Sequence, residues 1–477
     1  MPAGNIESKP PKEEQKKPLI ELSKGLHGKV IDDLNVHEIE EVFGKLYGWM
    51  ASEGAISSPS LKVQYINEMN QWGLVTGTDL KEGDMILSIP KHVMISSLLP
   101  TDKDPEDIPY CDLTRRWSDD GLKKLFIQSD ERQSLISPSR IPNVVLSLCL
   151  IHESKKNGGS FYQPYLDSLP QFISQPITWD YENLEILQGS SIYHAAVSAS
   201  EQLKSDYKIL AETLFTHPSQ GFTMEHYNWA MLTVSTRAFD INMPNRKTPL
   251  KALIPILDII NMGASHPELK SAEITNEFTE ESGSPLVNFF INGNFNAGDQ
   301  VLLSSSSCTN TICFVLNHGF IPKLENDFLP LYILDNSNHL LYIPILEDYA
   351  PKEAVDKELL DIKTKIILHN RLSSIRLAPS LVSEIIGIFR LLCANREQIQ
   401  NIIDTKSLAS IFNELSPENE KCAILSLKEL LTNSVASYPT HYEMDKLLLK
   451  TLSQSNDVPK ETLLALESLV REKSLFF

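Results

Sequence analysis

Residues 235–262, which read STRAFDINMPNRKTPLKALIPILDIINM, hold the pattern around which the rest of the chain can be arranged. They follow apolar residues within 227–234 that recur at the spacing of one helix face, so a helix is expected to end near Arg237. Pro255 then favours an extended conformation for the residue before it. The stretch therefore predicts a helix end followed, over 250–257, by a strand that enters a turn.

Polar side chains stand at both ends of this stretch. Arg237 falls at the helix end, and Asp258 and Asn261 fall in the turn after the strand. Two such ends can converge on one small polar ligand, because a guanidinium and a carboxylate or amide can hold it by hydrogen bonds. The same residues also fit an ordinary helix–strand junction closed by an Arg–Asp ion pair. Composition alone favours this second interpretation.

Length and charge narrow the class of protein. With 477 residues the chain is expected to fold as two or three domains, and its hydrophobic fraction of 42% suffices for globular cores. The net charge of −19 argues against direct nucleic-acid binding, because phosphate contacts need clustered basic side chains. An acidic surface suits a basic protein substrate, and it equally suits a protein that its charge merely keeps in solution.

The cysteines and the apolar runs indicate the cellular compartment in which the protein is expected. Six cysteines are scattered without a C-x-x-C pair, so neither a metal site nor a disulfide framework is expected. Residues 1–18 lack the apolar core of a secretory signal, and the longest apolar run, 144–151, is too short to cross a bilayer. We therefore expect no membrane association and a reducing compartment, cytoplasmic or nuclear.

Turn and strand signals recur far apart in the chain. Residues 80–90 and 295–304 each place a Gly–Asp turn before a short apolar strand, so strands from both parts are expected to assemble in one domain. The pair at 292–293, Asn–Gly after an apolar run, indicates a hairpin. Residues 35–54 are expected to form a helix, and residues 1–34 a disordered extension that begins rich in Lys, Glu and Pro.

Helical patterns occupy two further regions, about 100–235 and the chain beyond a brief strand-like piece at 329–345. The sequence contains no P-loop, H-E-x-x-H, nucleophile elbow or G-x-G-x-x-G motif. The serine run 304–307 has no histidine paired to it by motif, and His318 is better explained as a structural residue. Taken one by one, these features indicate only a large α+β protein with a helical C-terminal part.

In chain order, the short motifs are similar to those of one family. They are W-G-L (72–74), F-Y-Q-P-Y (161–165), S-T-R-A-F (235–239), D-I-I-N (258–261), G-D-Q-V-L-L (298–303) and N-H-G-F (317–320). Their order and spacing resemble the SET-domain protein methyltransferases of the RuBisCO large-subunit lysine methyltransferase type. Within that type, the layout looks most like that of the actin-histidine methyltransferases. The resemblance spans about residues 45–470.

This resemblance implies an α+β fold and an activity. A β-rich SET domain, residues 35–325, would contain a helical insertion over about 100–235, and an all-α substrate-binding domain, residues 326–477, would follow. The implied function is an S-adenosylmethionine-dependent protein N-methyltransferase that acts on a lysine, or in second place a histidine. The implied partner is an intracellular protein such as actin or a histone.

The resemblance also assigns individual residues. Phe239 falls at the wall of the target channel, where an aromatic residue is typical of lysine-directed members. Ser305 falls at the position of the catalytic tyrosine. The positions that bind S-adenosylmethionine in the family are matched by Trp72, Gly73, Arg237, Asp258, Asn261, Met262, Gly319 and Phe320. No metal is implied.

Three positions depart from the family pattern and keep a second function open. Gln71 stands where the family has a glycine, Met262 where it has a histidine, and Ser305 where it has a tyrosine. A methionine cannot make the hydrogen bonds of a histidine, and a serine hydroxyl has a shorter reach than a tyrosine hydroxyl. Tyr332 and Tyr342 are the neighbouring tyrosines that the sequence offers instead. The alternative is a catalytically impaired SET-fold protein that acts as a protein-interaction module.

Overall fold

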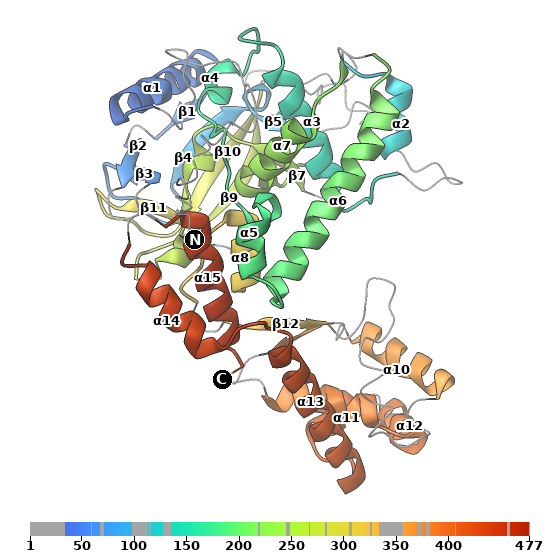
Figure 1. Ribbon diagram of the computed structural model, residues 1–477. Coiled ribbons are helices and arrows are strands. Elements are labelled where there is room, and N and C mark those ends of the chain that lie inside the picture. The colour runs from blue at the N-terminus through green and yellow to red at the C-terminus, as the bar shows by residue number, and fades with distance from the viewer. Residues whose placement is uncertain are drawn as a thin grey trace, which may run out of the picture.

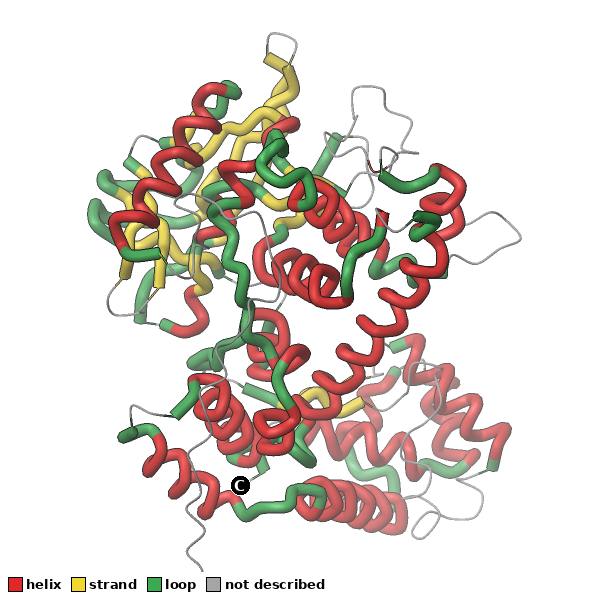
Figure 2. Tube along the Cα trace, turned by 45° about the horizontal axis from the view of Figure 1, so that its top comes forward, coloured by secondary structure: helices red, strands yellow, loops and turns green. Residues whose placement is uncertain are grey.

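A computed structural model of the chain describes most residues beyond 33 (Figure 1). The described residues are 34–58, 60–66, 71–97, 113, 116–126, 135–217, 220–244, 249–266, 268–281, 284–304, 308–324, 327–332, 356–370, 374–377, 382–405, 407–455 and 458–476. The expected disordered extension, 1–34, lies outside them except for its last residue. Figure 2 shows the strands gathered on one side of the larger part of the molecule, with helices beside them.

Strands from distant parts of the chain meet in one sheet, as predicted. The sheet has the order β1-β4-β10-β9 with antiparallel neighbours. Its strands are β1 (Ile56–Ser57), β4 (Met85–Pro90), β9 (Glu273–Glu281) and β10 (Ser284–Asn292). The two predicted turn–strand units also touch directly, because Leu80 and Phe295 exchange two backbone hydrogen bonds of 2.9 Å.

Residues 235–262 supply strands to two further sheets. These strands are β6 (Phe239–Ile241), β7 (Leu250–Leu253) and β8 (Asn261–Met262). One sheet has the order β5-β7-β6, and the other has the order β2-β3-β11-β8, in which β8 runs parallel to β11. The other strands of these two sheets are β2 (Leu61–Ile66), β3 (Gln71–Thr76), β5 (Ile95–Ser96) and β11 (Gln300–Leu303). The stretch therefore joins two sheets.

The expected helical insertion lies between β5 and β6. Its helices are α2 (Asp119–Phe126), α3 (Ile141–Ser154), α4 (Gln163–Leu166), α5 (Tyr181–Ile186), α6 (Ser191–Leu214) and α7 (Met224–Arg237). α3 is buried on every face from Val144 to Ser154, which fits its nearly unbroken apolar sequence, and it packs on α7. Ahead of the strands, α1 (Val36–Ser52) confirms the helix predicted over 35–54 and begins with a capping box made by Asn35 and Glu38.

Helix α7, which runs into residues 235–262, has the predicted apolar face. Thr223 caps the start of α7, and Tyr227, Ala230 and Val234 are buried. Arg237 is its last residue, and the chain becomes extended at the next one. The predicted helix end and its polar terminus are confirmed.

The C-terminal part is mainly helical and has its own core. Its described elements are α10 (Lys357–His369), α11 (Val382–Cys393), α12 (Arg396–Thr405), α13 (Pro417–Ala436), α14 (Tyr442–Leu452), α15 (Lys460–Lys473) and the strand pair β12 (Leu329–Tyr332) and β13 (Ser374–Leu377). Helices α10 to α13 share one apolar core, whereas α15 packs on α5 and α8 (Thr311–His318). α15 therefore ties the C-terminal part to the strand-containing part before it.

The hairpin predicted at 292–293 is wrong. The hairpin in this region joins β9 and β10, which end and begin at Glu281 and Ser284. After Asn292 the chain leaves this sheet and reaches the contact of Phe295 with Leu80. Gly293 is needed there for close packing, because a Cβ on it would lie 2.7 Å from the Cβ of Ala272.

The expectation of no disulfide is also wrong. The structure joins Cys308 to Cys313 and Cys393 to Cys422. The second pair is separated by 29 residues and meets because α11 packs on α13. Spacing in the sequence does not reveal such a pair, since it depends on how two helices pack.

Candidate functional site

Residues 235–262 form one wall of a cavity of about 380 Å³. Four residues that the resemblance assigned line it: Arg237, Phe239, Asp258 and Met262. The other walls come from β7, β9, β11 and the end of α8. Lys251 on one wall is paired with Asp240 at 3.0 Å, so this lysine is not an isolated charge. The structure thus brings together three of the residues expected at the donor site, Arg237, Asp258 and Met262, and Phe239 of the expected target channel.

Arg237, which lines this cavity, is held in a chain of polar side chains with Asp258 and Tyr165. Arg237 Nη1 donates to the Asp258 carbonyl at 3.2 Å and to Asp258 Oδ2 at 3.4 Å. The Tyr165 hydroxyl donates to the same Oδ2 at 2.7 Å. The Arg–Asp ion pair of the second interpretation is therefore present. It occupies only part of the guanidinium, and the side chain of Arg237 stays 22% exposed.

The turn that presents Asp258 is strained. Ile256, a buried β-branched residue, has φ of +71°, a region that such residues rarely adopt. A short 3-10 helix, Leu257–Ile259, follows and aims Asp258 back at Arg237. Burial raises the pKa of the Asp258 carboxyl, although Arg237 and the Tyr165 hydroxyl oppose this rise.

Trp72, Gly73 and Asn261 lie together beside this cavity but are not part of its wall. Asn261 Nδ2 donates to the Trp72 carbonyl at 2.9 Å, which fastens β8 to β3. A Cβ on Gly73 would lie 2.8 Å from Asn261 Nδ2 and 2.4 Å from Gln300 Nε2. Both atoms are the ends of flexible side chains, so a larger residue at position 73 would have to displace the amides of Asn261 and Gln300. Met262, which follows Asn261, connects this group to the cavity wall.

Gln300 lies beside Gly73 and outside the cavity wall, and the sequence interpretation gave it no role. Its Nε2 and Oε1 are both buried, and neither has a hydrogen-bond partner among the residues that the structure describes. An amide with one free donor and one free acceptor at this place complements a ligand that carries both a carboxylate and an ammonium group. The G-D-Q-V-L-L motif contained the residue, but nothing in the motif indicated an unpaired amide.

Gly319 and Phe320 do not line the cavity. Gly319 ends α8 with φ of +71°, and a Cβ on it would lie 2.5 Å from the Ser174 carbonyl oxygen. The ring of Phe320 packs on Phe314 and His318. His318 does line the cavity, and burial lowers the pKa of its imidazole, so the ring is uncharged at neutral pH.

The position expected for catalysis, Ser305, lies outside the described residues, as does Tyr342, and the side chain of Tyr332 is not described. The residues that border this gap, Ser304 and Cys308, both line the cavity. Gln71 begins β3 with an exposed side chain. Among the described tyrosines, the hydroxyl of Tyr165 reaches a cavity residue, through its bond to Asp258. The F-Y-Q-P-Y motif was its only signal in the sequence.

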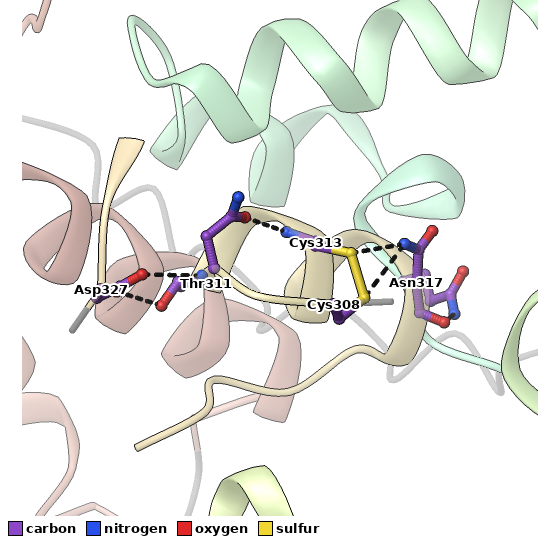
Figure 3. Close-up of a disulfide and its surroundings, with 7 residues drawn as sticks. Cys308, Thr311, Cys313, Asn317 and Asp327 are labelled. Carbon is purple, nitrogen blue, oxygen red and sulfur yellow. Dashed lines mark hydrogen bonds between the residues drawn. A yellow bond between two sulfur atoms is a disulfide. The ribbon is translucent and has the colours of Figure 1, made fainter. Parts of the chain in front are cut away.

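A disulfide forms part of the cavity wall (Figure 3). Cys308 lines the cavity and is bonded to Cys313 in the first turn of α8. The Asn317 side chain, one turn further along, points its amide at both sulfur atoms, at 3.7 and 3.2 Å. At the other side, Asp327 accepts hydrogen bonds from Thr311 at the start of α8. The helix that carries His318 is thus held at its start by Asp327 and near its end by the contact of Asn317 with the disulfide.

The part of the chain that the structure describes lacks two features. It contains no group of three or more His, Cys, Asp or Glu side chains arranged to hold a metal ion. None of its helices is both long enough and apolar enough to cross a membrane.

Comparison with protein families and curated proteins identifies relatives of the chain. Residues 355–476 match the family described as Rubisco LSMT substrate-binding. The actin-histidine N-methyltransferase of Mus musculus is 21% identical over 426 residues, which cover 86% of this chain and 64% of that protein. The enzyme of the same name from Gallus gallus is 21% identical over 451 residues, which cover 91% of this chain and 67% of that protein. The chain thus spans about two thirds of the length of these relatives.

Solved structures show the same fold. The SET domain of LSMT bound to lysine and AdoHcy superposes with a TM-score of 0.64 at 20% identity, covering 93% of this chain and 90% of that one. Rubisco LSMT bound to AdoMet superposes with a TM-score of 0.61 at 20% identity, covering 91% and 89%. The chain therefore has the α+β fold of the SET-domain proteins of the Rubisco LSMT type, and its C-terminal part matches the family described as Rubisco LSMT substrate-binding.

Proposed function

We propose that the chain is an S-adenosylmethionine-dependent protein N-methyltransferase that acts on a lysine side chain. The observation that carries this proposal is the convergence of Arg237, Phe239, Asp258 and Met262 on one cavity beside the group formed by Gly73, Asn261 and Gln300. It is supported by the names of the relatives and by the ligands of the solved structures of the same fold.

The described residues fit the amino acid part of the donor. Gln300 keeps a buried amide N–H and a buried amide oxygen without partners, and a carboxylate and an ammonium group would satisfy one each. Arg237 contributes guanidinium N–H groups that its bonds to Asp258 do not use. Trp72, Gly73 and Asn261 set the backbone spacing around them. Gly319 and Phe320 would bound the donor from the end of α8 in this proposal.

The chain's own residues have three tasks in the reaction. When bound, the donor supplies a methyl group on a sulfonium, which a neutral amine accepts. Phe239, Ile274 and Leu303 give the cavity apolar walls that keep water away from the amine. Asp258 and Tyr165 fix Arg237 in one position, so that its remaining N–H groups need no rearrangement on binding. Uncharged His318 adds no positive charge near the accepting amine.

The target is a protein, and actin is the first candidate because the relatives carry that name. Phe239 favours lysine over histidine as the accepting residue, since an aromatic wall is what the lysine-directed members have. The net charge of −19 suits a basic segment of the substrate. A cytoplasmic or nuclear location follows from such a substrate.

Methyl transfer into protein tests this proposal. The full chain, incubated with radiolabelled S-adenosylmethionine and either purified actin or a cell extract, should label protein, and hydrolysis should recover the label in methyllysine. Asn261→Ala should lower the rate at least tenfold, whereas Gln188→Ala, at an exposed position outside the C-terminal part, should not change it. Absence of labelled protein, or equal rates in the wild type and Asn261→Ala, would contradict the proposal.

The second candidate function is a protein-interaction module without catalysis. Met262 in the cavity wall favours it, because a thioether offers only a weak acceptor where the family has a histidine. This candidate predicts that the chain binds a protein partner but does not bind the donor.

A further inference from the structure

A second cavity, of about 350 Å³, lies where the start of α6, the end of α13 and the end of α15 meet. It shares no lining residue with the cavity at Arg237. Its polar lining includes Ser191, His194, Asn433, Ser434 and Glu472. The exposed side chains of His194 and Asn433 mark the side that opens to solvent.

Glu472 is a buried carboxylate with one oxygen satisfied and one oxygen free. The residue is only 2% exposed. Its Oε1 accepts from the Ser191 backbone N–H at 2.7 Å, at the start of α6, and from the Tyr438 hydroxyl at 2.7 Å. Its Oε2 is buried and has no hydrogen-bond partner among the described residues. A buried carboxylate oxygen without a donor is costly, so this oxygen is where a ligand would gain most.

The two cations that flank Glu472 on the same helix, Arg471 and Lys473, are engaged elsewhere. Lys473 binds Asp445 and Thr440, and Arg471 binds Asp327. No ion pair to Glu472 occurs within the described part of the chain. Burial raises the pKa of the Glu472 carboxyl, against hydrogen bonds from Ser191, Tyr438 and Ile192 that lower it, as expected for a buried carboxyl group that lacks a counterion.

The walls around Glu472 have the composition of a pocket for an alkyl cation. Leu329, Leu430 and Phe476 offer apolar surface for a methylene chain. Asn433 and Ser434 offer side-chain oxygens that can accept further N–H donors. We infer that this cavity binds an alkylammonium or alkylguanidinium group, as carried by a lysine or arginine side chain of a protein partner, through Glu472 Oε2. The inference is independent of the donor site and of methyl transfer.

Small probes of matched shape test this site. n-Butylguanidinium and n-butylammonium should raise the melting temperature of the full chain in a saturable way at millimolar concentrations, and calorimetry should give one binding site. n-Butylurea, which has a similar shape but no charge, should give no shift. The stronger of the two cationic probes identifies the side chain that the pocket prefers.

Two variants separate binding from folding. Glu472→Gln should reduce probe affinity at least tenfold, while Glu467→Gln, an exposed carboxylate on the same helix, should bind as the wild type does. Because Glu472 also caps α6, Asn433→Trp provides a second variant that fills the cavity mouth and leaves the carboxylate in place. It should abolish the probe-induced shift without lowering the melting temperature of the free protein. Equal shifts with n-butylurea, or undiminished binding in both variants, would show that Glu472 serves only as a helix cap.

Discussion

At the residue scale, the site depends on side chains that are held on one edge and free on the other. Asp258, with 1% of its side chain exposed, and buried Tyr165 occupy one part of Arg237, and the rest faces the cavity. Gln300 is the extreme case, since both polar atoms of its amide are buried without partners in the described structure. Polar atoms that are buried without partners lower the stability of the fold, and they remain available to bind a ligand.

Gln300→Leu tests both effects. The variant should bind S-adenosylhomocysteine at least tenfold more weakly, because a hydrogen bond to a charged group contributes about 1.5–3 kcal/mol. Its melting temperature should stay the same or rise, because the substitution removes two unsatisfied polar atoms. Calorimetry and thermal unfolding measure the two effects. Gln188→Leu, at an exposed position, is the control, and unchanged affinity in Gln300→Leu would remove this residue from the site.

The sequence predicted part of this site and could not predict the rest. Arg237, Asp258 and Asn261 flank one short stretch that could converge on one ligand; Arg237 and Asp258 line the cavity, whereas Asn261 lies beside it. Phe239, which the resemblance assigned, lines the cavity as well. The bond from Tyr165 to Asp258 spans 93 residues, and it forms only when the helical insertion packs on that stretch. Whether the side-chain amide of Gln300 finds a hydrogen-bond partner depends on how β3, β8 and β11 pack together. Such contacts depend on packing across the fold, which motif order does not show.

At the scale of elements, the sequence predicts structure correctly where the prediction depends on a single helix or strand. The apolar face of α7 and its end at Arg237 follow from helix periodicity, and both are confirmed. The Asn–Gly signal at 292–293 failed because the chain there crosses between sheets, where glycine is required by close packing and not by a tight turn. Periodicity describes one element well, but it does not identify the neighbour of that element.

A buried lysine gives the C-terminal helices a pH-dependent stability. Lys363 of α10 is fully buried and donates to the Leu392 carbonyl near the end of α11 at 2.7 Å, and burial lowers its pKa from 10.5 to about 7. Between these two pH values the unfolded chain binds the proton and the folded chain does not. The free energy of unfolding should therefore rise as the pH increases from 7 towards 10.

Lys363→Met should remove most of this rise, which is on the order of a few kcal/mol in full. At pH 6 the variant should be more stable than the wild type, because it no longer buries a charge. Urea unfolding at several pH values measures the effect, with Lys365→Met on the exposed side of the same helix as control. Parallel pH profiles for the wild type and Lys363→Met would contradict the assignment.

At the scale of the whole molecule, the chain is held together by contacts between distant segments. Asp327 joins the start of α8 to Arg471 of α15, and Glu472 joins α15 to the start of α6. The order of motifs indicated a SET-type part followed by a helical part, and the fold confirms this. The order of motifs did not indicate that α15 would pack on α5 and α8 of the preceding part. The domain boundaries at 34–35 and 325–326 remain predictions.

The two disulfides are the whole-molecule feature that the sequence interpretation excluded. Cys393–Cys422 closes a separation of 29 residues, so its reduction should lower the free energy of unfolding by about 3–4 kcal/mol in the chain-entropy description. Alkylation of the denatured, unreduced protein followed by mass spectrometry should label Cys149 and spare the paired cysteines. Labelling of Cys308, Cys313, Cys393 and Cys422 without reductant would show that these pairs are thiols in the isolated protein.

The central claim is that this SET-type fold has kept a working donor site, and donor binding tests it most directly. Isothermal titration of the full chain with S-adenosylhomocysteine should give saturable binding to one site, weakened at least tenfold in Arg237→Ala and unchanged in Arg396→Ala, an exposed arginine of α12. Thermal unfolding of both variants should show that each is folded. No detectable heat of binding at millimolar S-adenosylhomocysteine would contradict the claim and favour the interaction-module function.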